Sequence, residues 1–199
     1  MPKLTLTDLI EVVTKSGTPK ATKVAQIKYR EPYEPAADFY KRFRERVCEI
    51  HRLGLGKGDL KSILAGLSDP KKSANYPAVV AGYAKWWGRK DLAWFSPPST
   101  TYSASGVDVA VNPELGLEVN GVPYVIKMHL KTEPLPKSKA DLITAFLSEV
   151  LTASSSEETH FGVIDVRSAK LFEVSSSRRN LKAMIDAELA YISTLWPKV

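Results

Sequence analysis

The sequence has little of what disulfide frameworks and zinc centres are made of. Its 199 residues include one cysteine, Cys48, and three histidines. A single cysteine cannot form an internal disulfide, and this set offers no zinc-ligand spacing. Cys48 lies in a segment of helical periodicity, where a free thiol behaves as a small core hydrophobe. Disulfide scaffolds, zinc modules and thiol enzymes are therefore disfavoured.

Long apolar runs are also missing. No stretch approaches the roughly 20 apolar residues that span a bilayer, and Lys3 and Asp8 interrupt the N-terminal segment. We therefore expect a cytoplasmic protein with no membrane partner. The glycine-rich stretch 53–59 has neither Walker nor Rossmann spacing, so it predicts a helix end and a turn rather than a phosphate-binding loop.

The composition is that of a globular protein with a basic balance. Hydrophobic residues make up 44% and charged residues 25% of the chain, values that disfavour disorder. The net charge of +6 fits a polyanionic partner, because lysine and arginine neutralise phosphates. Nucleic acid is the partner that this charge favours, and a protein partner or a homodimer is left open.

Hydrophobic periodicity divides the chain into a helical first part and a mixed second part. Helices are predicted over residues 7–16, 36–53, 59–67, 76–90, 138–151 and 180–196, and strands over 107–111, 115–119, 123–131 and within 161–174. The predicted fold class is α/β (α+β), with a central, mostly antiparallel or mixed sheet that contains a β-meander flanked by helices. We expect one compact domain, in which a helical N-terminal extension (1–75) packs on an α/β core (76–199).

The dipeptide Asn120-Gly121 is a strong hairpin signal and fixes a strand register. In a two-residue turn, the numbers of paired residues sum to 241, so that Glu114 lies opposite Lys127. A slip by one residue would bury the charges. We expect the strands Val107–Val111, Leu115–Val119 and Pro123–Lys131 to form a contiguous antiparallel meander, with His129 and Asp108 farther along the same polar face.

Two interpretations of this polar face are open. In one, the face meets water and Glu114 and Lys127 form a cross-strand ion pair. In the other, it is a site for metal-assisted phosphodiester hydrolysis. Carboxylates would then hold Mg²⁺ or Mn²⁺, and the lysine would orient water or offset charge on the phosphorane. His129 is a candidate proton carrier in such a site.

The residues on these strands resemble a known motif. The order helix, three-stranded meander, helix, strand, with Pro113-Glu114 on the second strand and Lys127 on the third, resembles the restriction-endonuclease-like, or PD-(D/E)XK, superfamily of phosphodiesterases. The resemblance covers about residues 76–174. It implies an acid on the second strand and acid-x-lysine on the third. Glu114 and Lys127 match the outer positions, but the middle position is Val125, which cannot bind a metal.

This departure from the motif leaves three functional hypotheses. The first is a degenerate nuclease-like core that binds or helps to process nucleic acid with weak or no hydrolysis. The second is an active metal-dependent nuclease, in which Asp108 or Glu118 joins Glu114 as a displaced metal ligand. The third is a non-enzymatic interaction or assembly module.

Three further basic residues are candidates for nucleic-acid binding. They are Lys131, at the end of the third strand, and Arg178 and Arg179, at the start of the last helix. A helix N-terminus disfavours positive side chains unless an anion is shared between them and the free N–H groups. The alternative is two solvated arginines that follow a serine-rich loop.

Overall fold

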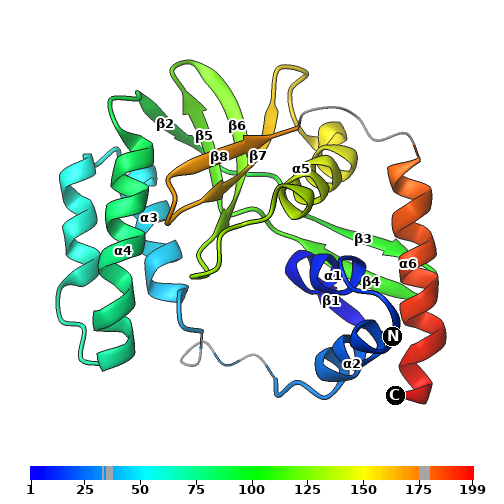
Figure 1. Cartoon of the computed structure of the whole chain (residues 1–199). Coiled ribbons are helices and arrows are strands. Elements are labelled where there is room, and N and C mark those ends of the chain that lie inside the picture. The colour runs from blue at the N-terminus through cyan, green and yellow to red at the C-terminus, as the bar shows by residue number, and fades with distance from the viewer. Residues whose placement is uncertain (33, 35–37, 175–179) are drawn as a thin grey trace.

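A computed structural model describes residues 1–32, 34, 38–174 and 180–199 (Figure 1). It has an α+β fold with two mixed sheets and a helical N-terminal region. The helices are α1 (Leu6–Val13), α2 (Gly17–Lys28), α3 (Lys41–Arg52), α4 (Pro70–Trp87), α5 (Lys137–Leu151) and α6 (Leu181–Leu195), with short 3₁₀ helices η1 (Lys57–Leu64), η2 (Thr152–Ser154) and η3 (Trp196–Lys198). The strands are β1 (Lys3–Thr5), β2 (Leu92–Phe95), β3 (Thr100–Ala104), β4 (Val107–Val111), β5 (Leu115–Val119), β6 (Val122–His129), β7 (His160–Asp165) and β8 (Lys170–Glu173).

The larger sheet has the strand order β2-β5-β6-β7-β8. Strands β6 and β7 are parallel, and α5 provides the crossover that a parallel pair requires. The other neighbours are antiparallel. The β5–β6 hairpin turns at Asn120 and Gly121, both with positive φ, as the favoured two-residue turn demands. Val119 pairs with Val122 and Leu115 with Ile126, so the predicted register is confirmed.

The predicted contiguous meander is wrong in its first strand. Residues 107–111 form a strand, β4, but it belongs to the smaller sheet, where it runs parallel to β1 and antiparallel to β3. Val111 pairs with Thr100 instead of Leu130. On the side away from β6, the neighbour of β5 is β2, a strand that the periodicity did not reveal. Alternation decides which residues share a face but not which strand lies alongside, and Pro113, between β4 and β5, cannot continue a ladder.

Each face of the larger sheet is covered by its own hydrophobic core. One face carries Leu115, Ile126 and Ile164, which pack with residues of α3 and α4. The opposite face carries Val125 and Val163, which pack in a core with residues of α1, α5, α6 and the smaller sheet. Figure 1 shows α3 and α4 on one side of the molecule and α1, α2 and α6 on the other. Much of the face that the sequence suggested to be half-exposed is therefore buried.

The N-terminal helices are divided between these two cores. Helices α1 and α2 pack with α6 and the smaller sheet, whereas α3 and η1 pack with α4. The expected boundary between residues 75 and 76 falls within α4. Helix α1 begins with a capping box, in which Thr5 Oγ1 accepts from Asp8 N at 3.1 Å and Asp8 Oδ2 accepts from Thr5 N at 3.0 Å. In the described ranges, no helix is long and apolar enough to cross a bilayer.

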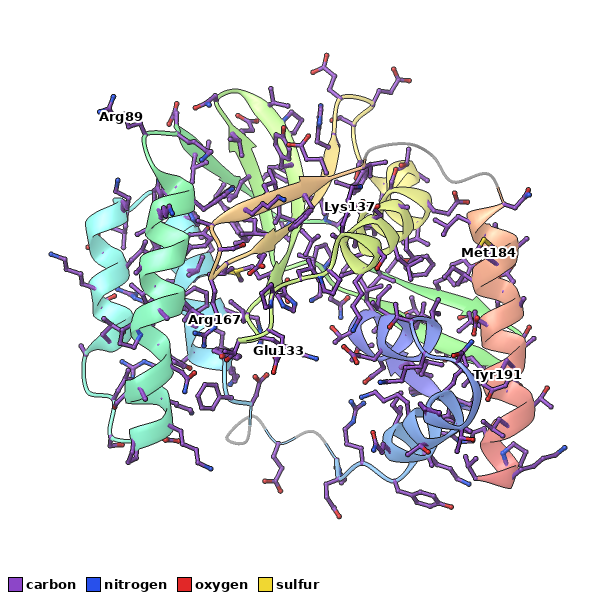
Figure 2. The ribbon with its side chains drawn as sticks, in the orientation of Figure 1. Arg89, Glu133, Lys137, Arg167, Met184 and Tyr191 are labelled. Carbon is purple, nitrogen blue, oxygen red and sulfur yellow. The ribbon has the colours of Figure 1, made fainter. Side chains whose placement is uncertain are left out.

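Helix α4 lies directly against the turn between β7 and β8. A Cβ atom on Gly82 would lie 2.0 Å from the carbonyl oxygen of Val166, so glycine permits this close approach. Arg167 ties the turn to its surroundings, donating to Tyr40 Oη at 3.1 Å and to Asn75 Oδ1 at 3.0 Å. Figure 2 shows Arg167 beside α4. The turn and α4 are therefore held as one unit.

A buried histidine joins the aromatic residues between α3 and α4. The exposed fraction of His51 is 4%, and its Nε2 lies 2.8 Å from Tyr83 Oη. Its ring centroid lies 4.5 Å from that of Trp87. Burial lowers the pKa of His51 from 6.5 to about 4 and raises the pKa of Tyr83 well above 10. The imidazole is therefore neutral at physiological pH.

Candidate functional site

Glu114 and Lys127 form an ion pair where β5 begins. Lys127 Nζ lies 2.5 Å from Glu114 Oε1, and Glu114 Oε2 accepts from Met128 N at 2.8 Å. The two side chains are 14% and 17% exposed. The β5–β6 ladder ends at Leu115, so the carboxylate of Glu114 takes the place of the next backbone acceptor. Both carboxylate oxygens have a donor, and the predicted pairing of the two residues is confirmed.

We expect Glu114→Ala to lower the free energy of unfolding by about 3 kcal/mol, because it leaves the Met128 N–H without its acceptor and the Lys127 ammonium without its carboxylate partner. Glu114→Gln keeps an oxygen acceptor and should cost less. The matched control is Glu118→Ala, which changes an exposed residue of β5. Urea unfolding measures all three, and equal effects at positions 114 and 118 would contradict this role.

Val125 is fully buried at the position where the motif of the resembling superfamily has its second acid. It lies opposite Gly116 on β5 and beside Phe161 on β7, within the core beneath α5. At this position a metal ion would meet the aliphatic side chain of valine, which has no oxygen to coordinate it.

The three carboxylates predicted as metal ligands do not lie together. Asp108 is on β4 in the smaller sheet, where its Oδ1 accepts from Ser103 Oγ at 2.6 Å. Glu118 lies opposite Pro123 near the hairpin turn, about 13 Å along the strand from Glu114. Within residues 1–32, 34, 38–174 and 180–199, no group of three histidine, cysteine, aspartate or glutamate side chains could hold a metal ion. The predicted donor set therefore does not fit Mg²⁺ or Mn²⁺, which need several oxygen ligands.

Lys127, His129 and Lys131 do line a common pocket of about 280 Å³. It lies between α1, the C-terminal end of β6 and the start of α5. Its floor is apolar and buried, and its rim is charged. The floor includes Leu6, Ile10, Leu135, Ile143 and Val163, and the rim carries Glu11, Lys127, His129, Lys131, Glu133 and Lys139.

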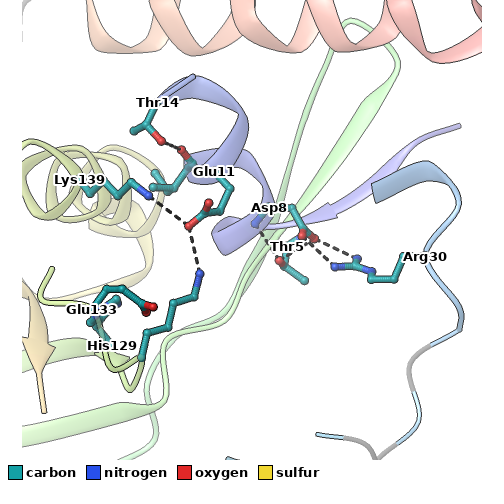
Figure 3. Close-up of polar contacts among 10 residues, drawn as sticks. Thr5, Asp8, Glu11, Thr14, Arg30, His129, Glu133 and Lys139 are labelled. Carbon is teal, nitrogen blue, oxygen red and sulfur yellow. Dashed lines mark hydrogen bonds and ion pairs between the residues drawn. The ribbon is translucent and has the colours of Figure 1, made fainter. Parts of the chain in front are cut away.

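Glu11, from α1, lies between two lysines of this rim (Figure 3). Its Oε1 is 3.2 Å from Lys131 Nζ and 3.2 Å from Lys139 Nζ. Burial raises the pKa of Glu11, but the hydrogen bonds from both lysines outweigh this effect and hold the pKa below its ordinary value. Glu11 and Lys139 were not predicted from the sequence, because no local pattern indicates that α1 and α5 meet at this point.

His129 is anchored at the edge of the same pocket. Its Nε2 lies 2.8 Å from the carbonyl oxygen of Glu133, which can only accept, so Nε2 carries the hydrogen. In the neutral ring, Nδ1 is then the acceptor. Asp165, the β7 partner of His129, accepts from Leu135 N at 3.1 Å. The segment between β6 and α5 is thus fastened to both strands, which fixes the shape of the pocket.

The other residues considered in the sequence are Lys131, Arg178, Arg179 and Cys48. Arg178 and Arg179 lie outside the described residues. Lys131 lines the pocket, with a side chain that is 53% exposed. Cys48 is outside the pocket and donates its thiol hydrogen to the carbonyl oxygen of Glu114 at 3.2 Å. Burial, and next the charge of Glu114, raise the pKa of the Cys48 thiol to about 11, so the thiol stays protonated at neutral pH.

No family model matches the chain, and no curated protein matches its sequence. The chemistry of the site is therefore inferred from its own residues. Lysines and an imidazole surround an apolar pocket, and one carboxylate lies between two of the lysines. Such a set can bind an anion. In the part of the chain that the structure describes, no group of three potential ligands could hold a divalent cation.

Proposed function

We propose that this protein binds nucleic acid through a degenerate nuclease-like core and hydrolyses it weakly or not at all. The observation that carries this proposal is the burial of Val125 together with the contacts that already occupy Glu114. A fully buried valine fills the position of the second acid, and the first acid is already engaged by Lys127 and by the N–H group of Met128.

The order of elements in the larger sheet supports the nuclease-like part of the proposal. Helix α4, strands β2, β5 and β6, helix α5 and strand β7 follow the order helix, three-stranded meander, helix, strand. Glu114 immediately precedes the second of these strands, and Lys127 lies on the third. Strands β3 and β4 are inserted between the first and second strands and belong to the other sheet.

The distribution of charge supports the binding part. The chain carries a net charge of +6, and Lys127, Lys131 and Lys139 converge at one pocket beside His129. Lysine contacts with phosphates supply most of the sequence-independent affinity for nucleic acid. The hypothesis of an active nuclease has less support, because neither Asp108 nor Glu118 lies beside Glu114.

We expect binding of single-stranded or duplex oligonucleotides to weaken as salt rises. Fluorescence anisotropy at several salt concentrations measures the slope of log K against log salt. The double variant Lys131→Gln, Lys139→Gln should make this slope shallower by about 1 to 2, since each phosphate contact contributes about 0.7 to 0.9. Lys137→Gln is the matched control, because Lys137 pairs with Asp141 and does not line the pocket.

The same oligonucleotides, incubated with Mg²⁺ or Mn²⁺, should remain uncut. Metal-dependent cleavage that Lys127→Ala abolishes would support the active-nuclease hypothesis and overturn this proposal. No binding even at low salt would also overturn it, and would leave the interaction module as the surviving hypothesis.

A further inference from the structure

The first turn of α5 combines two features that favour an anion. The helix predicted over residues 138–151 begins at Lys137, with Pro136 in the N-cap position and no side-chain hydrogen bond capping it. No acidic residue lies in the first turn, which instead carries Lys139, a residue that lines the pocket. The helix dipole disfavours positive side chains at this end and favours negative groups.

The anion that Lys139 contacts is the carboxylate of Glu11. Lys131 and Lys139 come from different elements, the segment after β6 and the helix α5, yet both donate to the same oxygen of Glu11. One oxygen between two ammonium groups is the arrangement that a phosphate or carboxylate of a ligand would adopt. The Glu11 side chain is 20% exposed and belongs to a third element, α1, so it is not part of either element that carries a lysine.

The pocket behind this carboxylate suits an apolar body of limited size. Its floor is formed by buried aliphatic side chains, among them Ile10, Ile143 and Val163. Its volume of about 280 Å³ is enough for one ring with a short substituent, given that a dry cavity of about 150 Å³ holds benzene. Ligand pockets commonly combine such apolar walls with a few polar groups that fix orientation.

We propose that the pocket between α1, β6 and α5 binds a compact organic anion, a single apolar ring that bears one phosphate or carboxylate, and that Glu11 occupies the anion position in the free protein. The ligand anion replaces the Glu11 carboxylate between Lys131 and Lys139, and its ring lies on the aliphatic floor. Binding of this anion in the pocket does not depend on nucleic-acid binding elsewhere on the protein surface.

The test is a titration followed by methyl NMR of the full chain. Benzoate and phenyl phosphate, each a single ring with one anionic group, should shift the methyl resonances of Ile10 and Ile143, while those of Ile50 and Ile63, in the other core, stay unchanged. Inorganic phosphate, which has no apolar body, should leave all four unchanged.

Two variants and a control assign the roles of the charges. Glu11→Gln should tighten binding of both ring-bearing probes roughly tenfold, since the competing carboxylate and its two exposed ion pairs are lost. Lys139→Gln should weaken it several-fold, and Lys137→Gln should bind as the wild type does. Absence of shifts in wild type and in Glu11→Gln, at probe concentrations up to about 10 mM, a range in which even weak millimolar binding is visible, would overturn the proposal. So would equal affinities in Glu11→Gln, Lys139→Gln and wild type.

The probe titration and the oligonucleotide-binding experiment test different proposals, and each can fail without the other. Probe binding without oligonucleotide binding contradicts the proposed function alone, and oligonucleotide binding with no probe shifts contradicts the pocket alone.

Discussion

Replacement of Gly82 by alanine is expected to lower the free energy of unfolding by about 3 kcal/mol or more. The added Cβ would lie 2.0 Å from Val166 O, 3.0 Å from Val166 C and 3.1 Å from Arg167 Cα. All three are backbone atoms, so no side-chain rotation relieves the overlap. Helix α4 and the β7–β8 turn would have to separate, which loosens the hydrogen bonds from Arg167 to Tyr40 and Asn75.

Gly58→Ala provides the matched control for this prediction. A Cβ at Gly58 meets nothing within 4 Å, and its backbone is outside the left-handed region. Alanine there should be neutral or should stabilise the protein by up to about 1 kcal/mol, because it restricts the unfolded chain. Thermal or urea unfolding of the two variants is the measurement. Similar midpoints for Gly82→Ala and wild type would mean that α4 and the turn are not in contact as described.

Acidification is expected to destabilise the protein through His51. The pKa of His51 is about 4 in the folded state and 6.5 for an ordinary histidine. Between these values the unfolded chain binds a proton that the folded protein does not, so the free energy of unfolding falls as the pH falls from 6.5 towards 4. A shift of this size corresponds to about 3 kcal/mol over the whole window, and to about 2 kcal/mol between pH 7.5 and pH 5.

Urea unfolding at pH 7.5 and pH 5 measures this loss. His51→Gln should remove most of the pH dependence in this window, at the cost of lower stability at pH 7.5. His160→Gln, which changes a histidine whose side chain is 50% exposed, should leave the dependence unchanged. An NMR titration that finds His51 protonated above pH 6 in the folded protein would contradict the prediction.

The parts of the fold that sequence analysis predicted correctly are encoded locally. Asn120-Gly121 and the alternation on either side of it determine the β5–β6 register and bring Lys127 opposite Glu114. The stripe of Phe43, Val47 and Ile50 on α3 is buried, as the helical spacing predicts. In each case, the residues that decide the structure are neighbours in the sequence or are joined by a tight turn.

The parts that were missed depend on distant segments. Strand β1 is three residues long and is defined by its pairing with β4, not by an alternating pattern of its own. Asp108 has the predicted alternation, but its strand belongs to the other sheet. The pocket requires α1 to approach α5, and no pattern within the sequence of Glu11 or Lys139 records that approach. A single sequence reports faces and turns, whereas these contacts follow from tertiary packing.

The pairing of β1 with β4 imposes an order on folding. During synthesis, residues 3–5 have no strand partner until residues 107–111 have been made, and α6 can cover the smaller sheet only afterwards. Until then, buried residues of the first two helices, such as Leu9, Val12 and Val24, are without most of their core. Contacts between segments so far apart in sequence close slowly, because the intervening loop must be ordered first. The core that lines the pocket therefore forms late, when the two ends of the chain come together.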